Sequence, residues 1–193
     1  MTPRGEDRAF VAVATVVGAA VIAYWIRSEM LIAAAPPSIP VHFDLHGRPD
    51  RWGGPGELRL LAVIATLLAV AMLGIAAWLP RGARRSPGLI NLPRKPTFLR
   101  LPPDARERVV APMRALTALL PLLFVGLFWW IAESMAGFAG PGGSARLRLP
   151  WAAPAVVLGL VFVLVGVAWV RTSRAIRAAA AEARDVAGGE ARR

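Results

Sequence analysis

His42, Asp44 and His46 are the residues of this chain whose types and spacing could do chemistry. The chain has two histidines and no cysteine, so a metal ion would have to be held by imidazole and carboxylate groups. In an extended segment every second side chain lies on the same side, which would bring these three together. The spacing is therefore compatible with a site for Zn²⁺ or another divalent ion.

The same stretch also has the composition of a braced turn. Pro36 and Pro40 exclude a continuing helix, so we expect an extended backbone up to a turn at Gly47. Glycine would supply a positive φ there, and Asp44 or Asp50 would accept backbone N–H bonds. On this interpretation the polar residues serve structure or partner recognition rather than catalysis.

Glu133 is the other residue of interest, at the end of an apolar run that contains Trp129 and Trp130. An acid inside a membrane is costly unless it is paired or near water. Glu133 is either an interfacial residue just past the membrane edge or a support beneath the motif stretch, with Arg27 or a histidine as its partner.

The motif stretch resembles the signature of the SdpI-type bacterial membrane immunity and signalling proteins, which carry the domain of unknown function 1648. The pattern is Pro-x-x-Ile-Pro-x-His-Phe-(Asp/Asn)-x-x-Gly-x-x-Asp, and the matching residues are Pro37, Ile39, Pro40, His42, Phe43, Asp44, Gly47 and Asp50. The resemblance implies immunity or signalling against a secreted toxin. Since the family pattern allows Asn in place of Asp44 and requires no histidine at position 46, it favours the structural or recognition role over the metal site.

The elements that must position these residues are membrane spans. Hydrophobic residues make up 56% of the chain, against roughly 45–50% in soluble domains, and they lie in long runs. A run of about 20 apolar residues can cross a bilayer as a helix. We therefore predict an all-α integral membrane four-helix bundle of two helical hairpins, forming a single membrane domain over 1–193. Its spans are 9–26, 58–79, 109–131 and 151–170, joined by a motif loop at 32–57 and a basic loop at 80–108, and followed by a basic tail at 171–193.

The distribution of Lys and Arg predicts the orientation. If the N-terminus is cytoplasmic, 17 of the 23 basic residues lie inside, as the positive-inside rule requires. Both termini then face the cytoplasm and the motif loop faces out, in a multi-pass protein of the plasma membrane. The net charge of +11 is a topology signal on this account and gives no support for nucleic-acid binding.

The basic loop mixes Lys and Arg with apolar residues, a composition that suits a segment lying on anionic lipid. Asp104 follows Pro102 and Pro103, where an acid favours a helix start. We therefore expect the third helix to begin well before the membrane. The apolar residues of this loop are Leu89, Ile90, Leu92, Phe98 and Leu101.

The leading functional hypothesis is binding or sensing at the outer face. We expect no enzymatic activity and no cofactor, because the sequence has no Gly-rich phosphate loop and no His-Glu-x-x-His motif. Expected partners are the lipid bilayer, a peptide toxin or other envelope ligand, and a cytoplasmic regulator. The alternatives are a membrane-embedded metal-dependent enzyme that uses His42, Asp44, His46 and Glu133, or a small transporter or accessory subunit.

Overall fold

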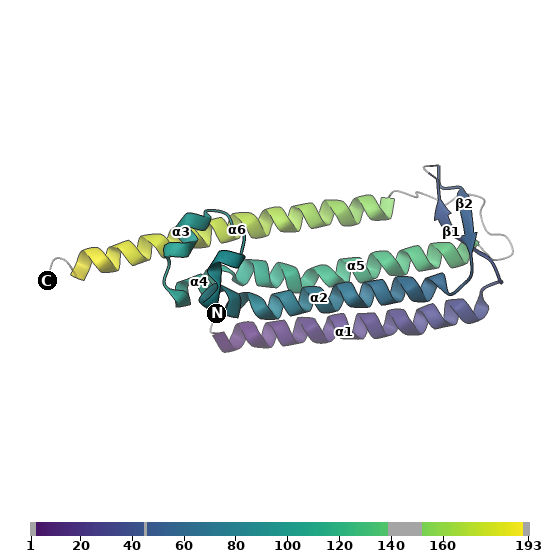
Figure 1. Ribbon diagram of the computed structural model, residues 1–193, viewed down its shortest axis with the longest axis horizontal. Coiled ribbons are helices and arrows are strands. Elements are labelled where there is room, and N and C mark those ends of the chain that lie inside the picture. The colour runs from purple at the N-terminus through teal and green to yellow at the C-terminus, as the bar shows by residue number, and fades with distance from the viewer. Residues whose placement is uncertain (1–2, 45, 139–151, 191–193) are drawn as a thin grey trace. The chain divides into compact units, whose positions relative to one another are not determined.

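The computed structural model describes residues 3–44, 46–138 and 152–190. Four long helices account for most of the chain, and a short hairpin follows the first of them (Figure 1). Leu45, Trp151 at the predicted start of the fourth span, and the last three residues of the basic tail lie outside the described residues. The elements are α1 (Pro3–Ala34), β1 (Ile39–Phe43), β2 (Pro49–Gly53), α2 (Glu57–Arg85), η1 (Pro87–Leu89), α3 (Lys95–Arg100), α4 (Pro103–Val109), α5 (Ala111–Phe138) and α6 (Ala152–Glu190).

The four long helices confirm the predicted fold class. Four helical stretches are long and apolar enough to cross a membrane, and each contains most of a predicted span: Asp7–Ala34, Glu57–Arg85, Ala111–Gly137 and Pro154–Asp185. The helices extend beyond the predicted apolar runs. In particular α1 continues through Arg27 and Glu29 to Ala34, because both charges find partners on other helices.

The contacts group the chain into two compact units, each of which takes a part of α1, α2, α5 and α6. We call Val11–Ala71 with Leu119–Leu160 the hairpin unit. We call Met1–Phe10, Met72–Ala118 and Val161–Arg193 the loop unit. The two are described separately below.

The core of the hairpin unit joins β1 to α1, α2 and α5. Tyr24 and Leu31 of α1, Leu58 of α2 and Ala132 of α5 are buried in one cluster with Ile39 of β1. The small residues Ala62 and Ala65 lie on the buried side of α2 and allow close packing. The hairpin is thereby attached to the helices through an apolar contact.

The loop unit has its own apolar core, and this corrects the expectation of a lipid-lying loop. Ile90, Leu92, Phe98 and Leu101 are buried in a cluster with Ile176 of α6. These apolar side chains pack against other protein atoms. The exception is Leu89, which is 76% exposed.

The break before α5 agrees with the sequence. A short helix, α4, begins at Pro103 with Asp104 in its first turn, and the chain then turns at Val110 before α5. Arg114, near the start of α5, donates from Nη2 to Asp7 Oδ1 at 2.9 Å, and its guanidinium lies 4.8 Å from the centroid of the Phe10 ring. These contacts attach the start of α1 to the loop unit.

Candidate functional site: a braced β-hairpin

The motif stretch folds into a two-stranded antiparallel hairpin. Ile39 pairs with Gly53 and Pro40 with Trp52 at its base, while His42 pairs with Arg51 nearer the turn. The register shifts on both sides of His42. In consequence the simple alternation expected from the sequence is interrupted at His42, and β1 ends at Phe43.

Asp44 and Gly47 build the turn, as the structural interpretation predicted. Asp44 Oδ1 accepts hydrogen bonds from the backbone N–H groups of His46 and Arg48, both at 2.8 Å. Gly47 has a φ of 75°, a conformation that glycine adopts without steric cost. The N–H of Arg48, together with that of His46, keeps the pKa of the Asp44 carboxyl below its usual value, although partial burial opposes this.

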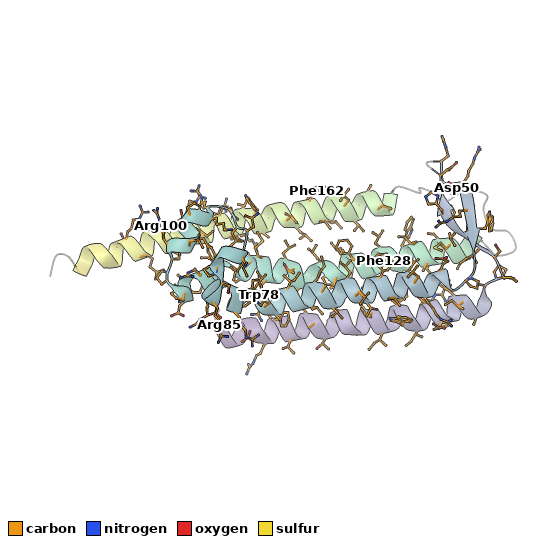
Figure 2. The ribbon with its side chains drawn as sticks, viewed as in Figure 1. Asp50, Trp78, Arg85, Arg100, Phe128 and Phe162 are labelled. Carbon is orange, nitrogen blue, oxygen red and sulfur yellow. The ribbon has the colours of Figure 1, made fainter. Side chains whose placement is uncertain are left out.

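His42 and Asp50 form the polar contact between the two strands. His42 Nδ1 lies 2.5 Å from Asp50 Oδ1, and both side chains are exposed. Figure 2 shows Asp50 on the hairpin, at the end of the hairpin unit. The histidine of the motif thus has a partner that is also in the motif.

Ile39 and Pro40 anchor the hairpin. Both are fully buried, and Ile39 belongs to the apolar cluster that contains Tyr24 and Leu58. Gly53 faces Val41 so closely that a Cβ there would lie 2.9 Å from Val41 Cγ1. A side chain at this position would force the Val41 side chain to shift, so the close packing favours glycine.

A bidentate ion pair joins α1 to α5 within the same unit. Arg27 donates from Nε to Glu133 Oε1 at 2.6 Å and from Nη2 to Oε2 at 2.9 Å. The Trp129 indole N–H also donates to Glu133 Oε1, at 3.1 Å. Arg27 is therefore the partner of Glu133, as one of the two interpretations predicted, and neither histidine takes that place.

Three further contacts support the hairpin unit and were missed from the sequence. Arg59 of α2 makes a bidentate pair with Glu29 of α1, with both distances 2.7 Å. The Tyr24 hydroxyl donates to the Phe128 carbonyl at 3.1 Å, and its ring stacks on Trp129. Isolated charges of opposite sign at the edges of two apolar runs could have indicated the Glu29–Arg59 pair.

The grouping of His42, Asp44 and His46 that the metal alternative requires is not assembled in the part of the chain that the structure describes. Within residues 3–44, 46–138 and 152–190 no group of three or more His, Asp or Glu side chains is placed to hold a metal ion. His42 is engaged with Asp50, and the His46 ring reaches only the second oxygen of Asp44, at 3.7 Å. Asp44 turns its other oxygen toward the backbone, because the turn begins there.

Comparison with known proteins finds one family model that matches this part of the chain. Residues 11–66 match the family described as Domain of unknown function (DUF1648), a range that covers most of α1, the whole hairpin and the start of α2. No curated protein and no solved structure matches the chain. The hairpin, most of α1 and the start of α2 are thus similar to the DUF1648 domain, which the SdpI-type membrane proteins also contain.

Proposed function

We propose that this multi-pass membrane protein binds or senses an envelope-active ligand at the hairpin, and that it is not an enzyme. The observation that carries the proposal is that some hairpin residues fix the backbone while others are exposed. Ile39 and Pro40 are buried and Asp44 is committed to the turn, so these residues fix the backbone. Arg51 and Trp52 are exposed on the strand that this backbone holds.

Trp52 and Arg51 supply the chemistry for recognition. Trp52 is 56% exposed, although tryptophan is on average a highly buried residue. Tryptophan and arginine are also the side chains most often responsible for affinity in protein interfaces. Acidic and basic groups, among them Asp50 and Arg48, lie on the same hairpin, which suits a peptide with mixed polar and apolar groups.

The resemblance to SdpI-type proteins supports a secreted peptide toxin as the ligand class and immunity or signalling as the outcome. The excess of Lys and Arg in the predicted cytoplasmic segments supports a plasma-membrane location with the hairpin facing outward. Signalling would in addition require a cytoplasmic regulator.

The charged pairs beneath the hairpin favour a brace over a transport pathway. Arg27 is seven residues from the end of α1, about 10 Å along the helix, and Glu133 is five residues from the end of α5, about 8 Å. Charges that mark an ion pathway are expected deep within the bilayer. These two lie close to the ends of their helices.

The proposal is tested by tolerance to secreted membrane-active peptides in a sensitive bacterial host. Expression of the wild-type chain should raise the tolerated concentration of at least one such peptide, and Arg51→Ala and Trp52→Ala should reduce that gain. Leu89→Ala is the matched control, since it removes an exposed side chain from the loop unit. Membrane levels of each variant are measured alongside. Protection that survives both hairpin substitutions, or no protection by the wild-type chain against any peptide, would contradict the proposal.

A further inference from the structure

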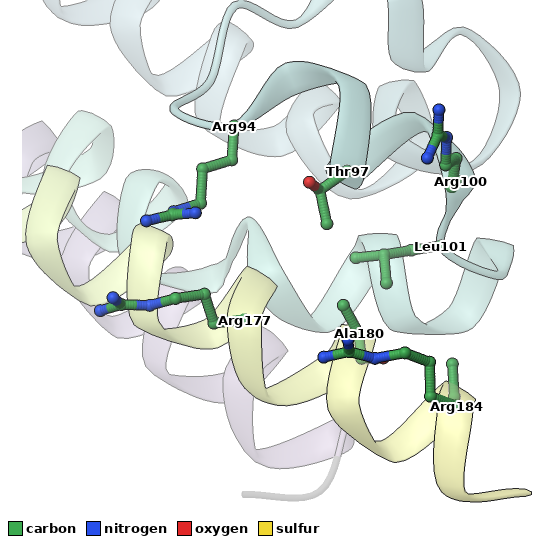
Figure 3. A pocket seen from close by; sticks show the side chains of 8 residues that line it. Arg94, Thr97, Arg100, Leu101, Arg177, Ala180 and Arg184 are labelled. Atoms are coloured by element: carbon green, nitrogen blue, oxygen red, sulfur yellow. The ribbon is translucent and has the colours of Figure 1, made fainter.

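The loop unit contains a pocket with four arginines in its lining. The pocket has a volume of ≈ 670 Å³ and is lined by the segment that contains α3 and by the C-terminal part of α6. Arg94 and Arg100 come from the first wall, Arg177 and Arg184 from the second, and no acidic residue lines it. Figure 3 shows the side chains of Arg94 and Arg177 extending in the same direction from the two walls.

Three acids of the loop unit are engaged with arginines that do not line the pocket. Asp104 and Glu107 pair with Arg84, at 3.2 and 2.9 Å, and Glu182 lies 3.9 Å from Arg108. Among the residues that the structure describes, no carboxylate pairs with any of the four pocket arginines. A guanidinium stays charged at every physiological pH, so the pocket concentrates positive charge that nothing in its lining offsets.

Phosphate is the anion that this lining suits. The planar guanidinium donates two parallel hydrogen bonds to a phosphate, which is why arginine predominates where phosphates are recognised. Thr97 adds a hydroxyl, and Leu101 and Ala180 add apolar surface for the rest of a ligand. The volume is within the roughly 300–1,000 Å³ of small-molecule sites. Because one phosphate carries a charge of only about −1.5 to −2, four arginines match a ligand with more than one phosphate.

The position of the arginines on α6 favours a soluble ligand over a lipid headgroup. The apolar run of α6 ends at Val170, so Arg177 is about 10 Å and Arg184 about 21 Å further along the helix. The headgroup layer is only about 5–8 Å thick on each side of a bilayer. The second wall therefore extends beyond the depth of the headgroups. We propose that this pocket binds a soluble ligand that carries more than one phosphate group.

The test uses the full-length chain in neutral detergent at low ionic strength, with pyrophosphate as the probe. Pyrophosphate should raise the melting temperature saturably, as expected for a ligand that binds only the folded state. Arg177→Gln/Arg184→Gln should weaken the apparent affinity by roughly tenfold or more, because two charge-assisted hydrogen-bond donors are lost. Arg94→Gln/Arg100→Gln alters the other wall and should weaken the apparent affinity by a similar factor. A loss of affinity in both double variants would not be explained by a folding defect confined to α6.

Arg171→Gln/Arg174→Gln is the matched control, since it removes the same charge from the same helix and neither residue lines the pocket. It should change the affinity by less than about twofold. Equal losses of affinity in the control and in the pocket variants would show diffuse attraction to a basic surface and overturn the proposal, as would the absence of saturable binding.

The same variants are compared in nanodiscs with and without phosphatidylglycerol. Stabilisation that depends on the pocket arginines and appears only with the anionic lipid would assign the pocket to a headgroup and overturn the soluble ligand.

Discussion

The residues of the motif have different structural roles, and the sequence predicts only some of these roles. The turn could be predicted, because Asp and Gly at this spacing have strong local preferences. Gly47 and Asp44 indeed have the expected conformation and contacts. The partner of His42 could not be predicted, because it depends on how β1 pairs with β2. The register of this pairing shifts on both sides of His42, so side chains do not simply alternate there. The metal hypothesis relied on that alternation.

Ile39 should matter more for stability than His42. Ile39→Ala removes a fully buried side chain and should lower the free energy of unfolding by about 2–5 kcal/mol. His42→Ala removes a contact in which His42 is 61% exposed, so the loss should stay below about 1 kcal/mol. Denaturation of the detergent-purified variants measures both values. Added Zn²⁺ should leave the melting temperature of the wild type unchanged, and a zinc-dependent rise that disappears in His42→Ala would restore the metal site.

Asp44 should make the hairpin sensitive to acid. Its carboxylate accepts two backbone N–H bonds in the folded state, which lowers its pKa below that of an unfolded chain, about 3.9. A lowered folded-state pKa contributes stability that is present above the unfolded value and is lost as the pH falls through the folded value. The stability advantage of the wild type over Asp44→Asn should therefore shrink below about pH 4.

Hydrogen exchange at the hairpin amides between pH 3 and pH 6 measures this advantage. Asp44→Asn is the appropriate comparison, because the amide keeps an oxygen that can accept the N–H bonds but does not titrate in this range. A difference between the two proteins that stays constant with pH would show that ionisation of Asp44 contributes nothing to the hairpin.

At the scale of elements, the sequence predicts where helices exist better than where they end. Apolar runs located all four long helices, and Pro102–Pro103 with Asp104 located the start of α4. The helix α1 continues beyond the span predicted at 9–26, because Arg27 and Glu29 have partners on other helices that the sequence does not reveal. The apolar residues of the basic loop at 80–108 were expected on the lipid surface for a similar reason, since the sequence does not show that Ile176 of α6 and its neighbours bury most of them.

The Arg27–Glu133 pair should behave as a coupled brace between α1 and α5. Arg27→Glu and Glu133→Arg each place two like charges side by side and should lower the melting temperature. The double exchange restores opposite charges and should recover part of the loss, with the lost Trp129 hydrogen bond accounting for the remainder. Melting of the four proteins in detergent closes this double-mutant cycle. Losses that simply add in the double variant would show that the two residues act independently.

At the scale of the whole molecule, the function depends on which side of the membrane each segment faces. The distribution of basic residues predicts one arrangement, and the two proposed ligands would require the same one. An envelope peptide would require the hairpin of Ile39–Gly53 to face outward, and a cytoplasmic ligand with more than one phosphate group would require the pocket of Arg94 and Arg177 to face inward. Four spans with cytoplasmic termini meet both requirements, because the loop that follows α1 and the loop that follows α2 then face opposite sides.

Reporter fusions test this orientation without relying on either ligand. A reporter that is active only in the cytoplasm should work when fused after Arg85 or after Glu190, which lie in segments rich in Lys and Arg, and should fail when fused after Phe138. A reporter that is active only outside the cytoplasm should show the reverse pattern at the same three positions, which controls for fusions that are poorly expressed. If the two patterns were exchanged, the hairpin would face the cytoplasm. The brace formed by Ile39, Asp44 and Gly47 would still hold it, but an envelope ligand could no longer reach Arg51 and Trp52.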